Sequence, residues 1–515
     1  MSGGAADAHE QSLARAVRRS LGVFYTPPAV AERLAGDAID RVLRRLPPGA
    51  VKLFDPACGS GNLLIAGYRR LLQAHAQAGS RIDAEGRRRI VEGSIFGVDV
   101  DAEAVARARE ALAQAAGVAV DLSANVRVGD AIREHERREF SVLLANPPYL
   151  DAETMTRHHA ALRAFCHGRY AAASGNWDLF CVFVERCLQL CAPGGSCALL
   201  VPNKLASADY ARAARGLLVT NGWRLRLVRD LQAVPVFAAG IYPIAVLVEH
   251  GGEDGGVVVE RMTGIDEVAE RVVVPAERFA DPSRPWPLYA GEAARVVARI
   301  EAAGRPLGTI AEVHGAATVA EAYAIAGLVR EGERGLRIVN SGTIDPYTPL
   351  WGVKPMRYLG ASYVRPVIPD ELQAMLPARR LAEARRPKVV VSGMTRELEA
   401  VLDSDGEYLA GKSTTIVSGS RIDLRVIVAV LNSEVMRGYY RNVYAADRLA
   451  GGYLRVGPPQ LSRLPVAEFA GQAAGRIINL VEARVAGAVA VTRAIDEAVA
   501  EGYGVTSADV QALAR

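Results

Sequence analysis

Lysine is nearly absent from this chain of 515 residues, since only five lysines stand among its 61 basic residues. Arginine and alanine are abundant instead, which indicates coding bias rather than function. The commonest nuclease core ends in Glu-x-Lys or Asp-x-Lys. Here the residues two positions before the five lysines are Ala50, Pro202, Gly352, Arg386 and Ala410. None of them is acidic, which argues against a fused nuclease core of that type.

Long apolar runs are also missing. The N-terminal stretch MSGGAADAHEQ has none, so we expect no signal peptide, and no other stretch reaches membrane-spanning length without charges or Gly and Pro breaks. Half of the residues are apolar and 23% are charged, which is ordinary for a globular protein. We therefore expect a cytoplasmic enzyme of two or three domains with no membrane partner.

Cysteine is scarce, and its six residues form no C-x-x-C pair. Four of them, Cys181, Cys187, Cys191 and Cys197, fall in or near the apolar stretch WDLFCVFVERCLQLC, which has a helical pattern. We predict buried thiols, with neither disulfides nor a metal site.

Net charge is small, at +4, but residues 354–463 hold 17 Lys and Arg against 11 Asp and Glu, including RRLAEARRPK at 379–388. A solvated helix face is the commoner explanation of such a run. A surface laid against phosphates would suit it equally.

Apolar strand-like runs alternate with helical runs through residues 51–250. VKLFDPAC, SIFGVDVD, NVRVGDA and FSVLLANPP have strand patterns, and GNLLIAGYRRLLQAHA and AEAVARAREALAQAA have helical ones. SCALLVPNK, RLRLVRDL and IAVLVEH continue the strands, and VVVERM could add one at the edge. This alternation predicts βαβ units and a parallel sheet.

The proline-rich stretch FADPSRPWPLYAG at 279–291 is the preferred domain boundary. Short strands and turns dominate beyond it, until an Ala-rich helical tail begins near residue 467. The predicted domains are 1–280, 281–466 and 467–515.

Informative residues follow the predicted strands, where the carboxyl ends of a parallel sheet bind ligands. The first strand leads into DPACGSGN, whose Gly59 and Gly61 let backbone approach a ligand, although the third glycine of a dinucleotide fingerprint is missing. Asp99 could accept both hydroxyls of a ribose, and Asp130 an exocyclic amine. The fourth strand runs into NPPY (146–149), whose two prolines stop any regular structure.

This constellation resembles the S-adenosylmethionine-dependent amino-methyltransferases. GVFYTPPAVAERLA (22–35) stands before the glycine loop, which is the motif order of the gamma group of N6-adenine DNA methyltransferases. VNSGTIDPYTPLW, RPKVVVSG and VIVAVLNSEVMRGYYRN with LRVGPPQLSRLPV resemble the target-recognition domain of TaqI-like and Eco57I-like enzymes. The resemblance covers roughly residues 20–466. It implies a Rossmann-like class I α/β methyltransferase domain followed by a mixed α+β target-recognition domain.

The resemblance implies S-adenosylmethionine as cofactor. Asp99 would hold its ribose and Asp130 its adenine amine, and Asp55 with the backbone near Cys58 would take its methionine end. The expected cofactor-binding residues are Tyr25, Thr26, Asp55, Ala57, Cys58, Gly59, Gly61, Asp99, Val100, Asp130 and Ala131.

The tetrapeptide has a chemical purpose in this family. Adenine N6 is a poor nucleophile, and two acceptors, the Asn146 side-chain oxygen and the Pro147 carbonyl, would bind its hydrogens and stabilise the charge that develops. Pro148 stiffens the backbone, and Tyr149 offers a ring to a base flipped out of the duplex. The resemblance places a second aromatic residue at Phe237.

GEYLAGKS (406–413) satisfies the phosphate-loop pattern G-x-x-x-x-G-K-S. Such a loop must follow a strand and open a helix, whereas STTIVS after it has a strand pattern, and LDSDGE before it suggests a hairpin turn. We therefore reject ATP binding. The expected DNA-contacting residues are Lys204, Lys354, Arg396 and Lys412.

The sequence thus predicts a site-specific adenine-N6 methyltransferase acting on double-stranded DNA, with any restriction endonuclease encoded separately. Two alternatives are methylation of an RNA base or a protein glutamine, and a non-catalytic DNA-specificity subunit. Cytosine-N4 methylation is disfavoured, because that group tends to carry Ser in place of Asn146.

Overall fold

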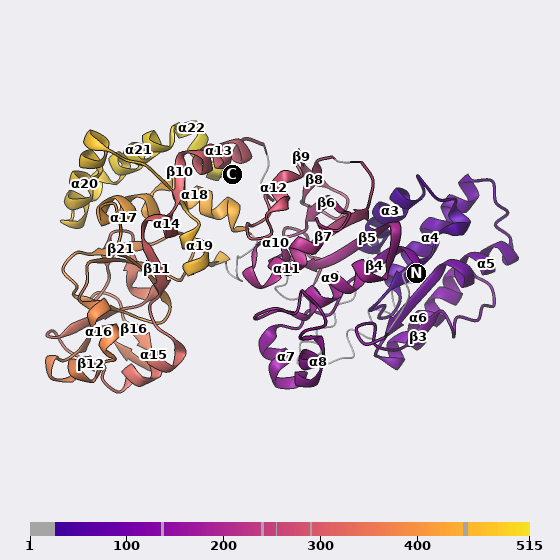
Figure 1. Ribbon diagram of the computed structural model, residues 1–515, viewed down its shortest axis with the longest axis horizontal. Coiled ribbons are helices and arrows are strands. Elements are labelled where there is room, and N and C mark those ends of the chain that lie inside the picture. The colour runs from indigo at the N-terminus through magenta and orange to yellow at the C-terminus, as the bar shows by residue number, and fades with distance from the viewer. Residues whose placement is uncertain are drawn as a thin grey trace. The chain divides into compact units, whose positions relative to one another are not determined.

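The computed structural model describes residues 26–134, 139–237, 242–253, 255–288, 291–445 and 452–514. The chain divides into two compact units, Met1–Ala290 and Gly291–Arg515, called here the N-terminal and C-terminal units (Figure 1). Within the described ranges, no helix is both long and apolar enough to cross a membrane.

The N-terminal unit is built on a nine-stranded sheet of order β3-β2-β1-β4-β5-β7-β6-β8-β9. Its strands are β1 (Leu53–Asp55), β2 (Ile95–Asp99), β3 (Val126–Val128), β4 (Phe140–Ala145), β5 (Cys191–Pro202), β6 (Trp223–Asp230), β7 (Pro243–His250), β8 (Val257–Met262) and β9 (Val268–Val274). The predicted strands of residues 51–250 are all present.

The prediction of a parallel sheet is correct for β1 to β5 and wrong for β7, which pairs antiparallel with both β5 and β6. A parallel neighbour requires a crossover connection, and no described helix stands between β6 and β7 to supply one. β9, which the sequence pattern did not indicate, pairs antiparallel with β8 and forms the edge in its place.

The described helices of the N-terminal unit are α3 (Pro28–Val42), α4 (Asn62–Gln77), α5 (Ala84–Ser94), α6 (Ala102–Ala116), α7 (Ala152–His158), α8 (Ala160–Cys166), α9 (Leu179–Leu190), α10 (Lys204–Ser207), α11 (Arg212–Leu217) and α12 (Glu277–Ala280). Among them, α4, α6, α9 and α11 were predicted from the sequence, and the others were not. α6 shows why these helices form: Asp101 accepts hydrogen bonds from the first turn, and Gly117 in the left-handed conformation ends the helix.

All six cysteines are buried, as predicted. The prediction that four of them share a helical stretch is wrong in part. Cys181 and Cys187 lie in α9, whereas Cys191 and Cys197 lie in β5, which begins directly where the helix ends.

The C-terminal unit contains two four-stranded sheets, β11-β23-β19-β21 and β12-β18-β13-β22. Its strands are β10 (Gly304–Pro306), β11 (Glu312–Gly315), β12 (Arg330–Glu331), β13 (Leu336–Val339), β14 (Ile344–Asp345), β15 (Thr348–Pro349), β16 (Met356–Tyr358), β17 (Ala361–Tyr363), β18 (Pro366–Ile368), β19 (Lys388–Ser392), β20 (Met394–Thr395), β21 (Ala400–Asp403), β22 (Tyr408–Ala410), β23 (Thr414–Ser418), β24 (Leu454–Arg455) and β25 (Pro465–Ala467).

The sequence predicted short strands and turns for this unit before the helical tail, but the structure also contains helices there. The described helices of the unit are α13 (Gly291–Ala303), α14 (Leu307–Ile310), α15 (Val319–Ala326), α16 (Ala378–Ala384), α17 (Leu424–Asn432), α18 (Glu434–Val443), α19 (Pro458–Ser462), α20 (Gly471–Val485), α21 (Thr492–Tyr503) and α22 (Ser507–Ala514). α20 packs on α17, and α22 packs on α13 and α18, so the helices drawn in yellow in Figure 1 belong to this unit.

Candidate active site

The carboxyl ends of β1, β2, β3 and β4 meet at one edge of the sheet, because these strands are parallel and in register. A cavity of about 530 Å³ lies at this edge. Its lining includes eleven residues predicted from the sequence: Thr26, Asp55, Ala57, Cys58, Gly59, Asp99, Val100, Asp130, Ala131, Asn146 and Pro148.

The glycine loop takes its shape from positive φ angles, +50° at Gly59 and +89° at Gly61. Gly61 does not line the cavity. A Cβ on Gly61 would lie 3.0 Å from Cβ of Ala108 in α6, so this glycine permits close packing between the loop and that helix.

The Asp99 carboxylate holds the loop in place. Its Oδ2 accepts a hydrogen bond from the Gly59 N–H at 2.8 Å, and its Oδ1 accepts one from the Asp101 N–H at 3.0 Å. Each carboxylate oxygen keeps a second lone pair, so Asp99 can still accept hydrogen bonds from ribose hydroxyls.

Two buried polar groups of this loop suit the methionine end of S-adenosylmethionine. Ser60 is 3% exposed, and its Oγ has no hydrogen-bond partner among the described residues. Asp55 is 1% exposed; burial raises its pKa to about 8, and the nearby Asp99 charge adds to the rise, although the Ala57 N–H opposes it. A ligand that brings an ammonium group and a carboxylate would give both residues partners.

Asp130 has partners within the protein. Its Oδ1 accepts a hydrogen bond from the Ile132 N–H at 3.0 Å, and its Oδ2 lies 3.2 Å from Nε of Arg133. Ile132 and Arg133 also line the cavity. A ligand amine at Asp130 would therefore share the carboxylate with an arginine.

Sequence reasoning missed the apolar walls of the cavity, which include Ile132, Leu150, Leu179 and Phe183. These walls are suited to a flat ring such as adenine. Leu179 and Phe183 belong to α9, which is apolar at nearly every position near its start. Such a run looks like ordinary core, so it carried no signal of a binding wall.

The predicted tetrapeptide begins where β4 ends at Ala145. Asn146 and Pro148 line the cavity, whereas Pro147 and Tyr149 do not. The Tyr149 hydroxyl donates a hydrogen bond to the Leu200 carbonyl at 3.0 Å. The Phe237 ring stands edge to face with Tyr149, with centroids 6.0 Å apart, and does not line the cavity.

Of the pair predicted to close over the cofactor, Tyr25 lies outside the described residues. Thr26 is 5% exposed, and its carbonyl accepts a hydrogen bond from Nδ2 of Asn62 at 2.8 Å. Because Asn62 is the first residue of α4, this bond joins the segment before α3 to the glycine loop.

The four cations predicted to contact DNA are all exposed: Lys204, Lys354, Arg396 and Lys412. Lys204 begins α10 in the N-terminal unit, and the other three belong to the C-terminal unit. The Arg396 guanidinium lies 5.5 Å from the centre of the Tyr453 ring.

The phosphate-loop pattern at 406–413 is followed by β23, a strand, as predicted. The predicted hairpin turn before it is wrong. β21 and β22, which flank this turn, pair with β19 and β13 and belong to different sheets.

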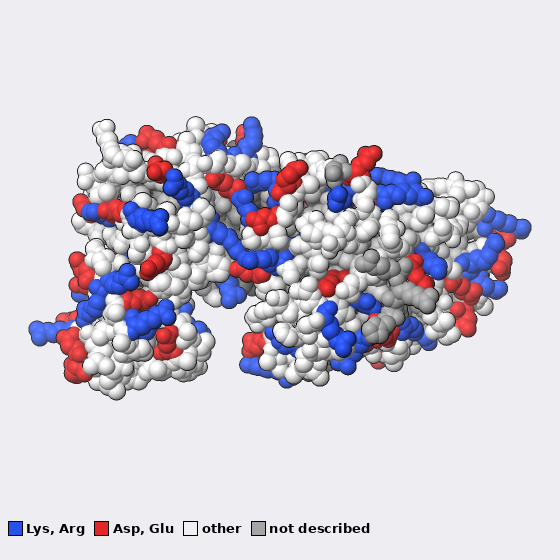
Figure 2. Space-filling view, in the orientation of Figure 1, with Lys and Arg blue, Asp and Glu red and all other residues white. Residues whose placement is uncertain are grey.

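The basic run at 379–388 corrects a prediction, because neither a solvated face nor a phosphate surface describes all of it. Arg380 is 3% exposed and donates a hydrogen bond to the Ala410 carbonyl at 2.6 Å. Lys388 is fully buried and pairs with Asp403. On the face shown in Figure 2, the remaining basic side chains of the unit are interspersed with acidic ones.

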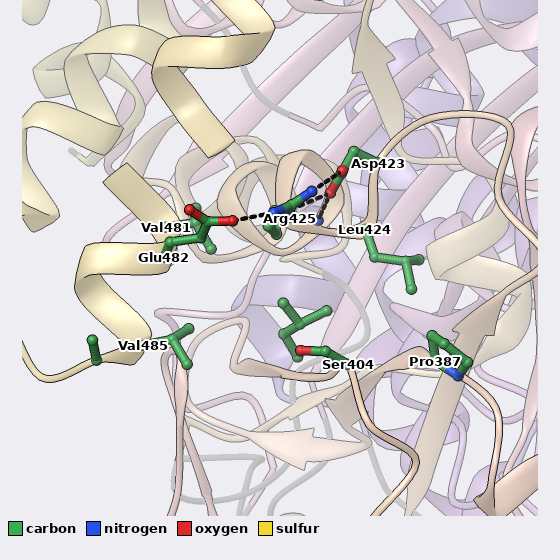
Figure 3. A pocket seen from close by; sticks show the side chains of 10 residues that line it. Pro387, Ser404, Asp423, Leu424, Arg425, Val481, Glu482 and Val485 are labelled. Carbon is green, nitrogen blue, oxygen red and sulfur yellow. Dashed lines mark hydrogen bonds and ion pairs between the residues drawn. The ribbon is translucent and has the colours of Figure 1, made fainter. Parts of the chain in front are cut away.

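A second cavity, of about 600 Å³, lies in the C-terminal unit (Figure 3). Arg425 lines this cavity and forms ion pairs with Asp423 and with Glu482 of α20, which line it too. Leu402, Leu424 and Val481 contribute apolar surface. It contains none of the residues predicted from the sequence.

Three family models match the sequence. Residues 93–237 match the Eco57I restriction-modification methylase, and residues 33–132 match the DNA-methyltransferase domain of MmeI. Residues 355–466 match the TaqI-like C-terminal specificity domain.

Curated methyltransferases are also similar to this chain in sequence. The adenine-specific methyltransferase PglX of Streptomyces coelicolor is 24% identical over 227 residues, which cover 35% of this chain and only 18% of PglX. The type II methyltransferase M.XhoI of Xanthomonas vasicola is 22% identical over 523 residues, which cover 87% of this chain and 91% of that protein.

Solved structures support the fold. The type IIL restriction-modification enzyme MmeI in complex with DNA has a TM-score of 0.57 at 13% identity, covering 99% of this chain and 80% of its own. The type ISP enzyme LlaGI has a TM-score of 0.53 at 10% identity, covering 90% of this chain and 54% of its own. With the strand order, these likenesses confirm the predicted class I methyltransferase fold.

Proposed function

We propose that this protein methylates adenine N6 at specific sites in double-stranded DNA. The chain joins a gamma-group adenine-N6 DNA methyltransferase domain to a TaqI-like specificity domain, which supports this proposal. One observation carries the proposal. Asn146 and Pro148 line the same cavity as Asp55, Gly59 and Asp99, so the tetrapeptide and the cofactor-type residues face one space.

The cofactor is S-adenosylmethionine, which supplies an electrophilic methyl group on sulfur. Asp55 and Ser60 would bind its methionine end, Asp99 its ribose, and Ile132, Leu179 and Phe183 its adenine. Burial, charge and position in the cavity support these proposed roles.

The protein's part in the transfer is to prepare the nucleophile. The Asn146 side-chain oxygen and the Pro147 carbonyl would accept hydrogen bonds from the amino group of the target adenine. These acceptors favour the geometry and positive charge that N6 develops as its bond to the methyl carbon forms and the carbon–sulfur bond breaks. N6 then loses a proton to water.

The target base must leave the duplex to reach this cavity. Tyr149 would stack on the flipped adenine, while Phe237, which stands at right angles to Tyr149, would contact its edge. Exposed Lys354, Arg396 and Lys412 would contact DNA phosphates from the C-terminal unit.

We assign the catalytic domain to 1–280, the target-recognition domain to 281–466 and a helical tail to 467–515. The enzyme would act in the cytoplasm as the modification part of a restriction-modification or related defence system. Its endonuclease would be a separately encoded partner.

The test is to express this chain alone in a methylation-free host and sequence the host DNA by a single-molecule method that detects modified bases. We expect N6-methyladenine at one short motif. Asn146→Ala should remove the modification while the purified variant still binds S-adenosylmethionine in calorimetry. Unmodified DNA from a cofactor-binding wild type, or full activity of Asn146→Ala, would contradict the proposal.

A further inference from the structure

Asp178 stands at the N-cap position of α9 but does not cap that helix, since its side chain makes no hydrogen bond to the first turn. Asp83, Asp101 and Asp151 occupy the same position in α5, α6 and α7, and each accepts a hydrogen bond from its own helix. A capping aspartate stabilises the helix that it precedes. Asp178 forgoes this contribution, so its carboxylate has another structural purpose.

Both oxygens of the Asp178 carboxylate bind groups outside α9. Oδ1 accepts a hydrogen bond from the Ala152 N–H at 3.2 Å, and Oδ2 accepts one from the Tyr210 hydroxyl at 2.6 Å. The side chain is buried, with 8% of the residue exposed. Next to it, the Leu179 N–H donates to the Leu150 carbonyl at 2.9 Å.

The bonds from Leu179 to Leu150 and from Ala152 to Asp178, called here the Asp178 bridge, lie directly after the tetrapeptide. Residues 146–149 contain no helix or strand. Their upstream end is fixed because β4 pairs with β1 and β5, and their downstream end is fixed by the bridge.

The bridge also borders the cavity. Leu150 and Leu179, which form one of its two bonds, line the same space as Asn146 and Pro148. The Tyr210 ring packs edge to face on Phe180, with centroids 6.4 Å apart, and this contact holds the hydroxyl that supports Asp178. A chain of contacts therefore runs from η2 (Asp209–Ala211) through Asp178 to the residues that follow the tetrapeptide.

We propose that Asp178 is a positioning residue for methyl transfer, which fixes the acceptor oxygens of Asn146 and Pro147 by holding the backbone at Ala152. The inference rests on the proposed function and adds a residue to it. Misplacement of a reacting group by about 1 Å can cost a factor of about 100 in rate. Two prolines fix φ at residues 147 and 148, so a shift at residues 150–152 has fewer backbone dihedrals through which it can be absorbed before it reaches the acceptors.

Asp178→Ala should lower kcat for methyl transfer roughly 10- to 100-fold while the KM for S-adenosylmethionine stays within about twofold. Asp178→Asn should keep kcat within about threefold, because the amide can accept from Ala152 and donate to the Tyr210 oxygen. Tyr210→Phe removes one support of the carboxylate and should lower kcat about threefold. The assay measures transfer of a tritiated methyl group to genomic DNA from a methylation-free host.

Asp83→Ala is the matched control, because it removes an N-cap aspartate of α5 that does not line the cavity. Its kcat should equal that of the wild type. A merely structural role for Asp178 would disturb the α9 side of the cavity, so cofactor affinity would fall together with kcat. That result, or a wild-type kcat for folded Asp178→Ala, would overturn the proposal.

Hydrogen exchange tests the bridge without DNA or activity. The Ala152 amide should exchange about tenfold faster or more in Asp178→Ala than in the wild type, and at the wild-type rate in Asp83→Ala. Unchanged exchange at Ala152 overturns the bridge, whereas a wild type that methylates no DNA overturns the proposed function instead. If Asp178→Ala does not fold, Tyr210→Phe replaces it: we expect a kcat about threefold lower and faster exchange at Ala152, and wild-type values of both in folded Tyr210→Phe would overturn the proposal.

Discussion

Two glycine-containing loops of this molecule resemble ligand-binding motifs in sequence, but a helix follows the first and a strand follows the second. Residues 56–61 follow β1 and lead into α4, and Gly59 lines a cavity. Residues 406–413 lie between β21 and β23, and the Gly411 N–H donates to the Val339 carbonyl. The element that follows a loop, rather than the spacing of its glycines, decides whether its backbone is available to a ligand.

The largest expected effect concerns the residue that holds the first loop. Asp99→Ala removes the acceptor of the Gly59 N–H and the proposed ribose acceptor, so we expect S-adenosylmethionine affinity to fall about 100-fold. Isothermal titration calorimetry measures it. Asp121→Ala, in an exposed turn, is the control, and affinity within twofold of the wild type for Asp99→Ala would show that the first loop needs no such support.

The next effect is a pH dependence. Since burial raises the pKa of Asp55 to about 8 from an ordinary 3.8, the folded ligand-free protein holds a proton that the unfolded chain loses. The protonated Asp55 therefore contributes to the free energy of unfolding, and this contribution is lost as pH rises from about 4 to 8. A bound ammonium group favours the ionised Asp55 carboxylate. As pH rises toward 8, S-adenosylmethionine affinity should therefore increase by up to about tenfold for each pH unit.

Calorimetry between pH 6 and 8 in two buffers of different ionisation enthalpy would detect the proton released on binding. Asp55→Asn should remove most of the pH dependence. An affinity that is flat across this range in the wild type would mean that Asp55 does not meet the ammonium group.

A smaller effect separates strain from contact in the first loop. Gly61→Ala places a side chain at φ +89° and brings Cβ to 3.0 Å from Ala108, so we expect about tenfold weaker cofactor binding and a lower melting temperature. Gly79 has a similar φ of +75° with nothing within 4 Å. Gly79→Ala should lower the melting temperature slightly and leave cofactor affinity unchanged. Equal losses of affinity in both variants would point to general destabilisation.

The smallest effect belongs to the second loop. Lys412→Ala should weaken DNA binding about threefold and lower the slope of log affinity against log salt by about one, as the loss of one phosphate contact does. Cofactor affinity should not change. Fluorescence anisotropy at several salt concentrations measures the slope. If Mg·ATP raised the melting temperature of the wild type, the second loop would bind phosphate after all, and the difference drawn between the two loops would be wrong.

Much of the N-terminal unit was predictable, because alternating patterns fix strands and helices locally, and parallel strands must bring their carboxyl ends together. Asp55, Asp99 and Asn146 could be placed at one edge for that reason. The antiparallel direction of β7 was not visible in its apolar pattern, which is the same in either direction. It depends on the absence of a crossover helix among the described residues before it.

The remainder depends on tertiary contacts that composition does not encode. Phe183 looks like core because a cavity wall and a core residue have the same apolar character. Arg380 and Lys388 look like surface charge because a sequence does not reveal which cations find buried partners. Asp178 looks like a helix cap, and only its hydrogen bonds to Ala152 and Tyr210 in the folded structure show otherwise.

The buried thiols have a practical consequence. All six cysteines lie between residues 58 and 197, so every one belongs to the N-terminal unit. Burial raises the pKa of Cys58, Cys181 and Cys187, which keeps these thiols protonated as well as hidden. The rate at which a thiol reagent labels the native protein therefore reports the opening of the N-terminal unit alone and is silent about the C-terminal unit. An unaltered chain thus contains its own local probe, with no label to introduce.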